Sequence, residues 1–175
     1  MEQSMSRAAL ILIGVLAACG EGQVMPVRRT TSQVVRDSAN SAYALLQERG
    51  HAAMGVDQYT AAHRFETLPD GGRITLERNR NDTTGIAQIR RHMEQIAVSF
   101  RRGNFAMPGF VHDREVPGTR IMTARRALIN YTTDSTPAGG QLRITSQDSV
   151  AIDAVHRFLA FQRQDHRTGH EREGR

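Results

Sequence analysis

Apolar side chains recur three or four residues apart in three stretches of the 175-residue chain. These stretches are Ser32–Arg49, Ile86–Arg102 and a segment that follows a cap at Ser146 or Asp148. Their apolar stripes are Val34, Val35, Ala39, Ala42, Leu45 and Leu46; Ile86, Ile89, Met93, Ile96, Ala97 and Phe100; and Ala151, Ile152, Val155, Phe158 and Leu159. Such stripes predict amphipathic helices that pack on a core. Gly50 suits the C-terminal end of the first helix, and Asp82 or Thr83 suits the N-terminal cap of the second.

Two other stretches alternate apolar and polar residues around a Pro-x-Gly-Gly sequence, and each predicts a β-hairpin. The first hairpin joins Ala62–Leu68 to Arg73–Arg78, and the second joins Ala127–Thr133 to Gln141–Thr145. The paired glycines allow the positive φ angles of a tight turn. Alternation places His63, Phe65 and Thr67 on one face of the first strand, and Ile74 and Leu76 on one face of the second.

A hairpin followed by a helix thus occurs twice, and Gly71–Thr75 is echoed by Gly139–Thr145. We therefore predict an α+β fold with one antiparallel sheet of about four to five strands, built from two ββα units. The helices would cover one face of the sheet, and the first helix would precede it. The fifth strand would be Thr119–Met122, and Asn104–Gly118, which contains two prolines, is predicted to be a loop.

The N-terminus has the pattern of a secretion signal. A short polar start leads into the apolar run Ala8–Val15, which is too short to cross a bilayer as a helix, since that takes about 20 residues. Leu16-Ala17-Ala18-Cys19 follows, and it resembles the lipobox of bacterial lipoproteins. The resemblance implies cleavage before Cys19 and acyl chains on that cysteine, which would anchor the protein in the lipid bilayer. Gly20 stands where lipoproteins retained at the inner membrane of Gram-negative bacteria carry Asp, so in such a bacterium the outer membrane is favoured, with the domain facing the periplasm.

This interpretation divides the chain into a signal peptide (1–18), a flexible tether (19–31), a single α+β domain (32–167) and a polar tail (168–175). Cys19 is the only cysteine, so its acylation would leave the domain without thiol chemistry, and the absence of lysine excludes Schiff-base chemistry. No nucleophile elbow, phosphate-binding loop or metalloprotease motif occurs. The sequence therefore predicts no reaction, and a non-catalytic role is the expectation.

Histidine and methionine are the residues with chemistry to offer in such a domain. Imidazole suits zinc or copper, and imidazole together with thioether suits copper. The candidate metal ligands are His63, His92, His112, His156 and His166. None of them forms a tight ligand motif, so the alternative is that the histidines are hydrogen-bonded structural residues and the methionines fill the core.

The formal charge is +5, and all 23 basic residues are arginines. Arg157, Arg163 and Arg167 gather near the end of the last helix as a candidate anion site, because a guanidinium matches carboxylate and phosphate groups. The alternative is a solvated helix face, where positive charge suits a helix C-terminus. Nucleic acid is not expected as a partner of an exported protein.

The region from Gly50 to Gly169 resembles a set of uncharacterised bacterial exported proteins. The shared residues are Met54–Gln58, His63–Phe65, Ile89–His92, Phe105, Pro108, His112, Phe158–Gln162 and Asp165–Gly169. Those proteins often have a second histidine where this chain has Arg64, and this departure weakens a metal site built around His63. The resemblance implies no activity.

The expected function is a membrane-anchored, periplasm-facing binding or accessory domain. The first hypothesis is a transition-metal site for copper or zinc, and the second is a non-catalytic interaction module of the cell envelope that holds no metal. The expected partners are the lipid bilayer, through acylated Cys19, and an envelope protein or an anionic envelope polymer.

Overall fold

The structure is a computed structural model that describes residues 30–168. The predicted signal peptide, Cys19 and the tether up to residue 29 lie outside the described residues, as does the tail from residue 169. No helix in the described part of the chain is long and apolar enough to cross a membrane.

Two antiparallel hairpins form a four-stranded sheet with the strand order β1-β2-β4-β3. The first hairpin consists of β1 (Ala62–Leu68) and β2 (Gly71–Glu77), and the second consists of β3 (Ile129–Thr136) and β4 (Gly139–Ser146). The strands β2 and β4 pair at the centre of the sheet. The predicted α+β class and the two hairpins are confirmed. Both could be predicted because the alternation of apolar residues and the paired glycines of a turn depend only on neighbouring residues.

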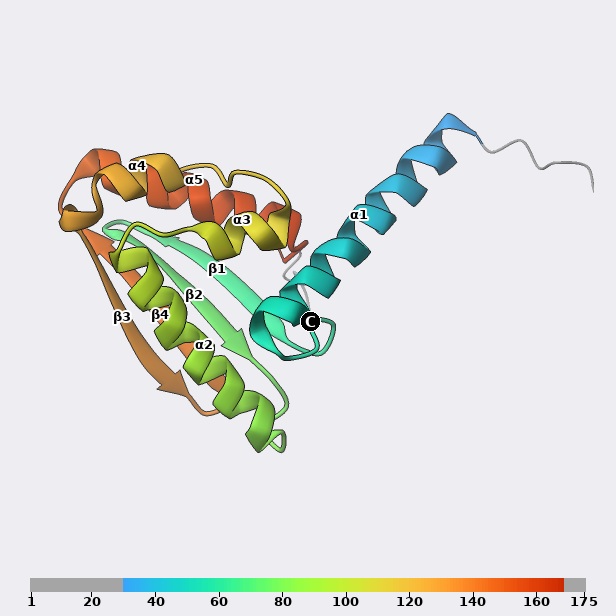
Figure 1. Cartoon of the computed structure of the whole chain (residues 1–175), viewed down its shortest axis with the longest axis horizontal. Coiled ribbons are helices and arrows are strands. Elements are labelled where there is room, and N and C mark those ends of the chain that lie inside the picture. The colour runs from blue at the N-terminus through green and yellow to red at the C-terminus, as the bar shows by residue number, and fades with distance from the viewer. Residues whose placement is uncertain (1–29, 169–175) are drawn as a thin grey trace, which may run out of the picture.

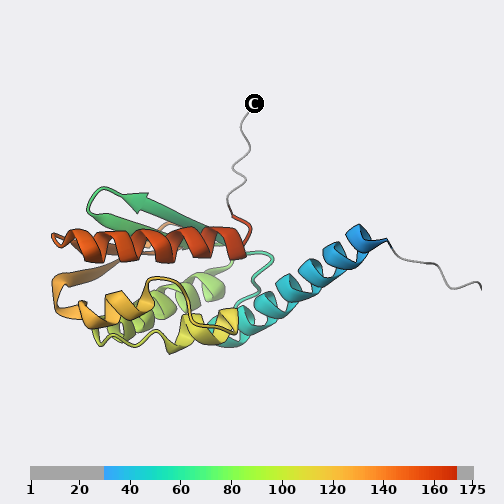
Figure 2. The ribbon, with the colours of Figure 1, turned by 90° about the horizontal axis from the view of Figure 1, so that it is seen from above.

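The three long helices also follow the prediction. Helix α1 (Thr31–Met54) precedes the sheet, α2 (Thr83–Arg101) follows the first hairpin, and α5 (Ser149–Asp165) follows the second. Asp82 and Asp148 cap α2 and α5: their carboxylates accept the N–H groups of Gly85 (2.9 Å) and Ala151 (2.7 Å). Figures 1 and 2 show α2 and α5 on the same face of the sheet.

The connection between α2 and β3 differs from the prediction. It contains the short helices α3 (Ala106–His112) and α4 (Thr119–Ala124) and the 3-10 turn η1 (Arg126–Leu128). The predicted strand Thr119–Met122 is therefore wrong, and so is the prediction that Asn104–Gly118 is a loop throughout. Gly118, at φ 89°, turns the chain so that the N–H of Met122 reaches its carbonyl (3.0 Å). Four residues are too few for a period to separate this helical turn from a strand.

Helix α1 is longer than predicted at both ends. It starts one residue earlier because Thr30 and Gln33 form a capping box, and it ends before Gly55, at φ 77°, rather than at Gly50. A Cβ atom at residue 50 would lie 3.0 Å from the Gln58 side chain. Gly50 thus allows a close approach inside the helix and does not end it.

The two ββα units depend on each other. Helix α2 of the first unit packs on the second hairpin, where Met93 lies over Gly140, while α5 of the second unit packs on the first hairpin, where Leu159 lies over Gly72. Each helix also supplies a donor to a hairpin turn: Arg90 donates to the carbonyls at 136 and 139, and the His156 ring bonds the carbonyl at 68. Each helix thus packs mainly on the strands of the other unit.

Helix α1 joins this body mainly through its C-terminal half. Residues 30–42 are exposed, and the N-terminal half of the helix projects away from the body in Figure 1. The attached half buries Leu46, and the Arg49 side chain donates to the carbonyl of Val111 at the end of α3 (2.8 Å). Arg167 holds α1 from the other side, because it donates to the carbonyl of Ala39 (2.8 Å) and lies over the Tyr43 ring.

Candidate functional site

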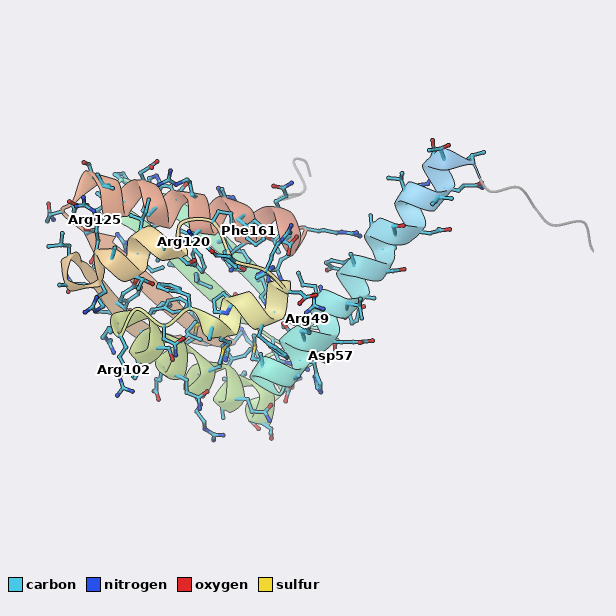
Figure 3. The ribbon with its side chains drawn as sticks, turned by 45° about the horizontal axis from the view of Figure 1, so that its top comes forward. Arg49, Asp57, Arg102, Arg120, Arg125 and Phe161 are labelled. Atoms are coloured by element: carbon cyan, nitrogen blue, oxygen red, sulfur yellow. The ribbon has the colours of Figure 1, made fainter. Side chains whose placement is uncertain are left out.

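A cavity of about 80 Å³ lies where α1 meets the body, between α1, α2, α3, α5 and the strands β1 and β2. Most of its lining is apolar, with Ala53, Met54, Phe65, Ile74, Leu76, Ile96, Phe100, Met107, Pro108, Val111 and Phe158. The polar lining consists of His63, His92, His112, His166, Gln58 and Gln162. We call this the histidine cavity. Figure 3 shows Arg49, which ties α1 to α3, at this junction.

His63 and His166 form a stacked pair at the cavity wall. His63 lies on the core face of β1, two residues before Phe65, as the alternation predicts, and His166 directly follows α5. The two ring centroids are 5.1 Å apart and the ring planes differ by 17°. The Nδ1–H of His63 donates to the carbonyl of Ala61 (3.2 Å), which leaves Nε2 as an acceptor.

Burial keeps both rings of the pair uncharged at neutral pH. Loss of solvent lowers the pKa of His63 to about 4, although the hydrogen bond to Ala61 opposes this shift. Burial also lowers the pKa of His166 well below its ordinary value, and the neighbouring His63 and His112 lower it further. The pair therefore presents neutral imidazoles that can donate or accept hydrogen bonds.

His112 is held in place by α5. Its Nδ1–H donates to Asp165 (2.5 Å), and its Nε2 lies 2.8 Å from the Oε1 atom of Gln162. Asp165 also pairs with Arg114 (2.9 Å), whose guanidinium lies over the Phe161 ring. Both ring nitrogens of His112 thus have protein partners, and this residue fixes the end of α3 against α5.

His92 differs from the other three histidines because one of its ring nitrogens is fully buried and has no hydrogen-bond partner among the described residues. It lies on the buried stripe of α2 beside Met93 and is 8% exposed. The unpartnered nitrogen is Nδ1. Burial lowers the pKa of His92 to about 4, and repulsion from His63 contributes. A neutral imidazole therefore lines the cavity with an unused polar atom.

Four of the five predicted metal ligands line one cavity, and His156 does not. Its Nε2–H donates to the carbonyl of Leu68 (2.9 Å), so it has the structural role that the alternative interpretation assigned to these histidines. Within residues 30–168, no three His, Cys, Asp or Glu side chains are placed to share a metal ion. One reason is the stacking of His63 on His166: the lone pairs of nearly parallel rings run side by side rather than converging.

The three predicted anion ligands each have a protein partner. Arg157 pairs with Asp153 (2.9 Å), Arg163 donates to the carbonyl of Phe65 (2.8 Å), and Arg167 holds α1 as described above. Arg163 and Arg167 thus tie α5 to β1 and to α1. In Figure 3, Arg102 and Arg125 lie on the body far from α1. The structure offers no support for an anion site at 157–167.

A second hollow, of about 280 Å³, adjoins the histidine cavity; we call it the vestibule. Its lining consists of Tyr43, Gln47, Gln58, Tyr59, Ala61, Ala62, His63, His166 and Thr168. Three of these residues, Gln58, His63 and His166, also line the histidine cavity, so they stand between the two spaces. Sequence reasoning missed the polar residues that α1 and the following loop contribute. The one available signal for Gln58 was its place in the shared segment Met54–Gln58.

Comparison of the chain with protein-family models, with curated proteins and with solved structures returns no match. The geometry of the two hollows therefore carries the functional argument.

Proposed function

We propose that this protein is a lipid-anchored binding protein of the bacterial cell envelope, which holds a small ligand in the histidine cavity on the periplasmic side of the membrane. The observation that carries the proposal is the buried, unpartnered Nδ1 of His92 in a cavity that three further histidines line. A buried polar group without a partner costs about 1–3 kcal/mol. A ligand that bonds to this nitrogen would remove that cost.

The lipobox supports the anchoring part of the proposal. In an anchored protein, the two halves of α1 would have different roles. A helix of 24 residues is about 36 Å long at about 1.5 Å per residue, and its projecting half would hold the body away from the bilayer. Its attached half supplies Gly50, Ala53 and Met54 to the cavity wall.

The lining favours a small organic molecule as the ligand. Binding sites for such molecules are concave and mostly apolar, with a few polar groups that fix orientation, and the histidine cavity has this composition. The second candidate is a copper ion, because the thioethers of Met54 and Met107 line the same cavity as the four imidazoles. Copper would require the stacked rings of His63 and His166 to turn toward a common point.

The test fills the cavity and follows the ligand. Ala53 lines the cavity, whereas its neighbour Ala52 is exposed and does not, so Ala53→Leu and Ala52→Leu make a matched pair in one helical turn. The full chain and both variants are purified from bacterial membranes. Bound organic compounds are then extracted for mass spectrometry, and copper and zinc are measured by elemental analysis.

The proposal expects one compound in near-equal amount with the wild type and with Ala52→Leu, and at least about tenfold less with Ala53→Leu, since the added methyl groups take its space. Stoichiometric copper with the same dependence would support the second candidate instead. If neither occupant is found, or if filling the cavity changes nothing, the interaction module without a ligand becomes the better hypothesis. Mass spectrometry of the N-terminal peptide checks the acyl chains on Cys19.

A further inference from the structure

The histidine cavity and the vestibule are lined without permanent charge. None of the described lining residues is Asp, Glu, Arg or Lys, although these types make up 23% of the chain. Charged groups do stand close by, but each is bound to the protein: Arg163 to a carbonyl of β1, Arg167 to α1, and Asp165 to His112. The polar groups that remain in the lining are amides, phenols, a hydroxyl and imidazoles.

The three imidazoles that are not held by a carboxylate are also uncharged at neutral pH. Burial lowers the pKa of His63 and His92 to about 4 and that of His166 well below its ordinary value. Apart from His112 and Asp165, which are already paired with each other, a charged ligand would therefore meet no opposite charge in either space. Burying a charge without a partner is far more costly than burying a hydrogen-bonded neutral group.

The two spaces differ in polarity, and this sets the order of groups along a ligand. The histidine cavity has room for several groups of the size of a water molecule, between the rings of Phe65, Phe100 and Phe158. The vestibule is wider and is lined by polar side chains. At the boundary, the free Nε2 of His63 can accept a hydrogen bond.

We propose that the site selects an uncharged amphiphile, with a ring-sized apolar body in the histidine cavity and amide, hydroxyl or carbonyl groups at the boundary with the vestibule. The polar end would bond with Gln58, His63 and His166, and the apolar end would lie among the phenylalanines. This inference rests on the proposed function and adds the chemical class of the ligand to it.

Three near-isosteric probes test the choice: benzamide is neutral, benzoate is an anion and benzamidinium is a cation. Binding to the full chain in lipid nanodiscs is measured by equilibrium dialysis at neutral pH, with empty nanodiscs as the blank. Benzamide should bind at least about tenfold more tightly than either ion, because only the ions lose solvation without gaining a counter-charge. Ala53→Asp should reverse the order in favour of benzamidinium. The matched variant Ala52→Asp, on the exposed side of α1, should leave the order unchanged.

Each other outcome overturns the inference in a distinct way. If the three probes bind equally and Ala53→Leu abolishes their binding, the cavity is a binding site but does not select by charge, so the proposed function stands alone. If benzoate or benzamidinium binds best to the wild type, the ligand is an ion and the inference is wrong. If no probe binds above the blank, the inference that the ligand has a ring-sized apolar body is wrong. The proposed binding function is then tested by the extraction experiment alone.

Discussion

Acidification should destabilise this protein through its buried histidines before most carboxylates are protonated. His92 gives the sharpest case, because it is 8% exposed and its Nδ1 has no partner. Burial lowers its pKa from 6.5 to about 4. The unfolded chain can therefore take up a proton at this residue at a pH where the folded protein cannot.

The sign and size of the effect follow from that difference. Above pH 6.5 the ring is neutral in both states, and its contribution to stability is fully present. As the pH falls from 6.5 to about 4, only the unfolded state binds the proton, so the free energy of unfolding decreases. At about 1.4 kcal/mol per pH unit, the loss reaches about 3 kcal/mol. This is a large part of the roughly 5–15 kcal/mol that holds a domain folded.

Urea unfolding followed by far-ultraviolet circular dichroism measures this loss on a chain that begins at Gly20. The variant His92→Gln keeps a polar side chain but cannot take up the proton, so its stability should fall by about 3 kcal/mol less than that of the wild type between pH 6.5 and about pH 4. His51→Gln, on the exposed side of α1, controls for the loss of a histidine. Parallel stability curves for the wild type and His92→Gln would refute the reasoning.

Two further predictions concern stability at neutral pH. Gly72→Ala should destabilise the protein by at least about 2 kcal/mol in urea unfolding, because its Cβ atom would lie 2.7 Å from the backbone oxygen of Glu66 and 2.1 Å from the buried Leu159 side chain. Gly109→Ala, which has ordinary contacts in α3, should instead be neutral or stabilising, and equal losses would contradict this. Asp165→Asn should cost about 1–3 kcal/mol because it removes the carboxylate that holds His112, whereas Asp153→Asn, in an exposed pair on α5, should cost less than about 1 kcal/mol.

The hairpins and long helices could be predicted because each depends on signals within a few residues of itself. Alternation and Gly-Gly turns specify β1–β2 and β3–β4, and aspartate caps mark the starts of α2 and α5. The failures lie where tertiary contacts decide. Gly50 has the sequence of a helix stop, but the helix continues to Met54, and the Gln58 side chain takes the space that a Cβ atom at residue 50 would need. The α4 turn is likewise buried through Met122 against the rest of the core.

The candidate site was predictable only in part. Strand alternation correctly placed His63 on the face with Phe65, and the helix stripe placed His92 near the core. The sequence could not show that α3 would bring His112 to the same cavity, because that region has no clear period. Nor could it show that the His156 ring would form a hydrogen bond with the carbonyl of Leu68 in β1. Convergence of side chains from four elements is a property of the packing.

The internal repeat explains why the cavity lies at one end of the sheet and not at the other. In the register of the hairpins, His63 stands opposite Leu76, and Tyr131 stands opposite Ile144 at the corresponding place in the second unit. Tyr131 is 2% exposed and packs edge-on against Phe100, so its larger ring fills the core there. His63 is smaller, and the space beside it is closed by α1 and α3, which have no counterparts in the second unit among residues 30–168. The hollow is therefore made by the elements that break the repeat, and one of them, α1, is the element that follows the proposed membrane anchor in the chain.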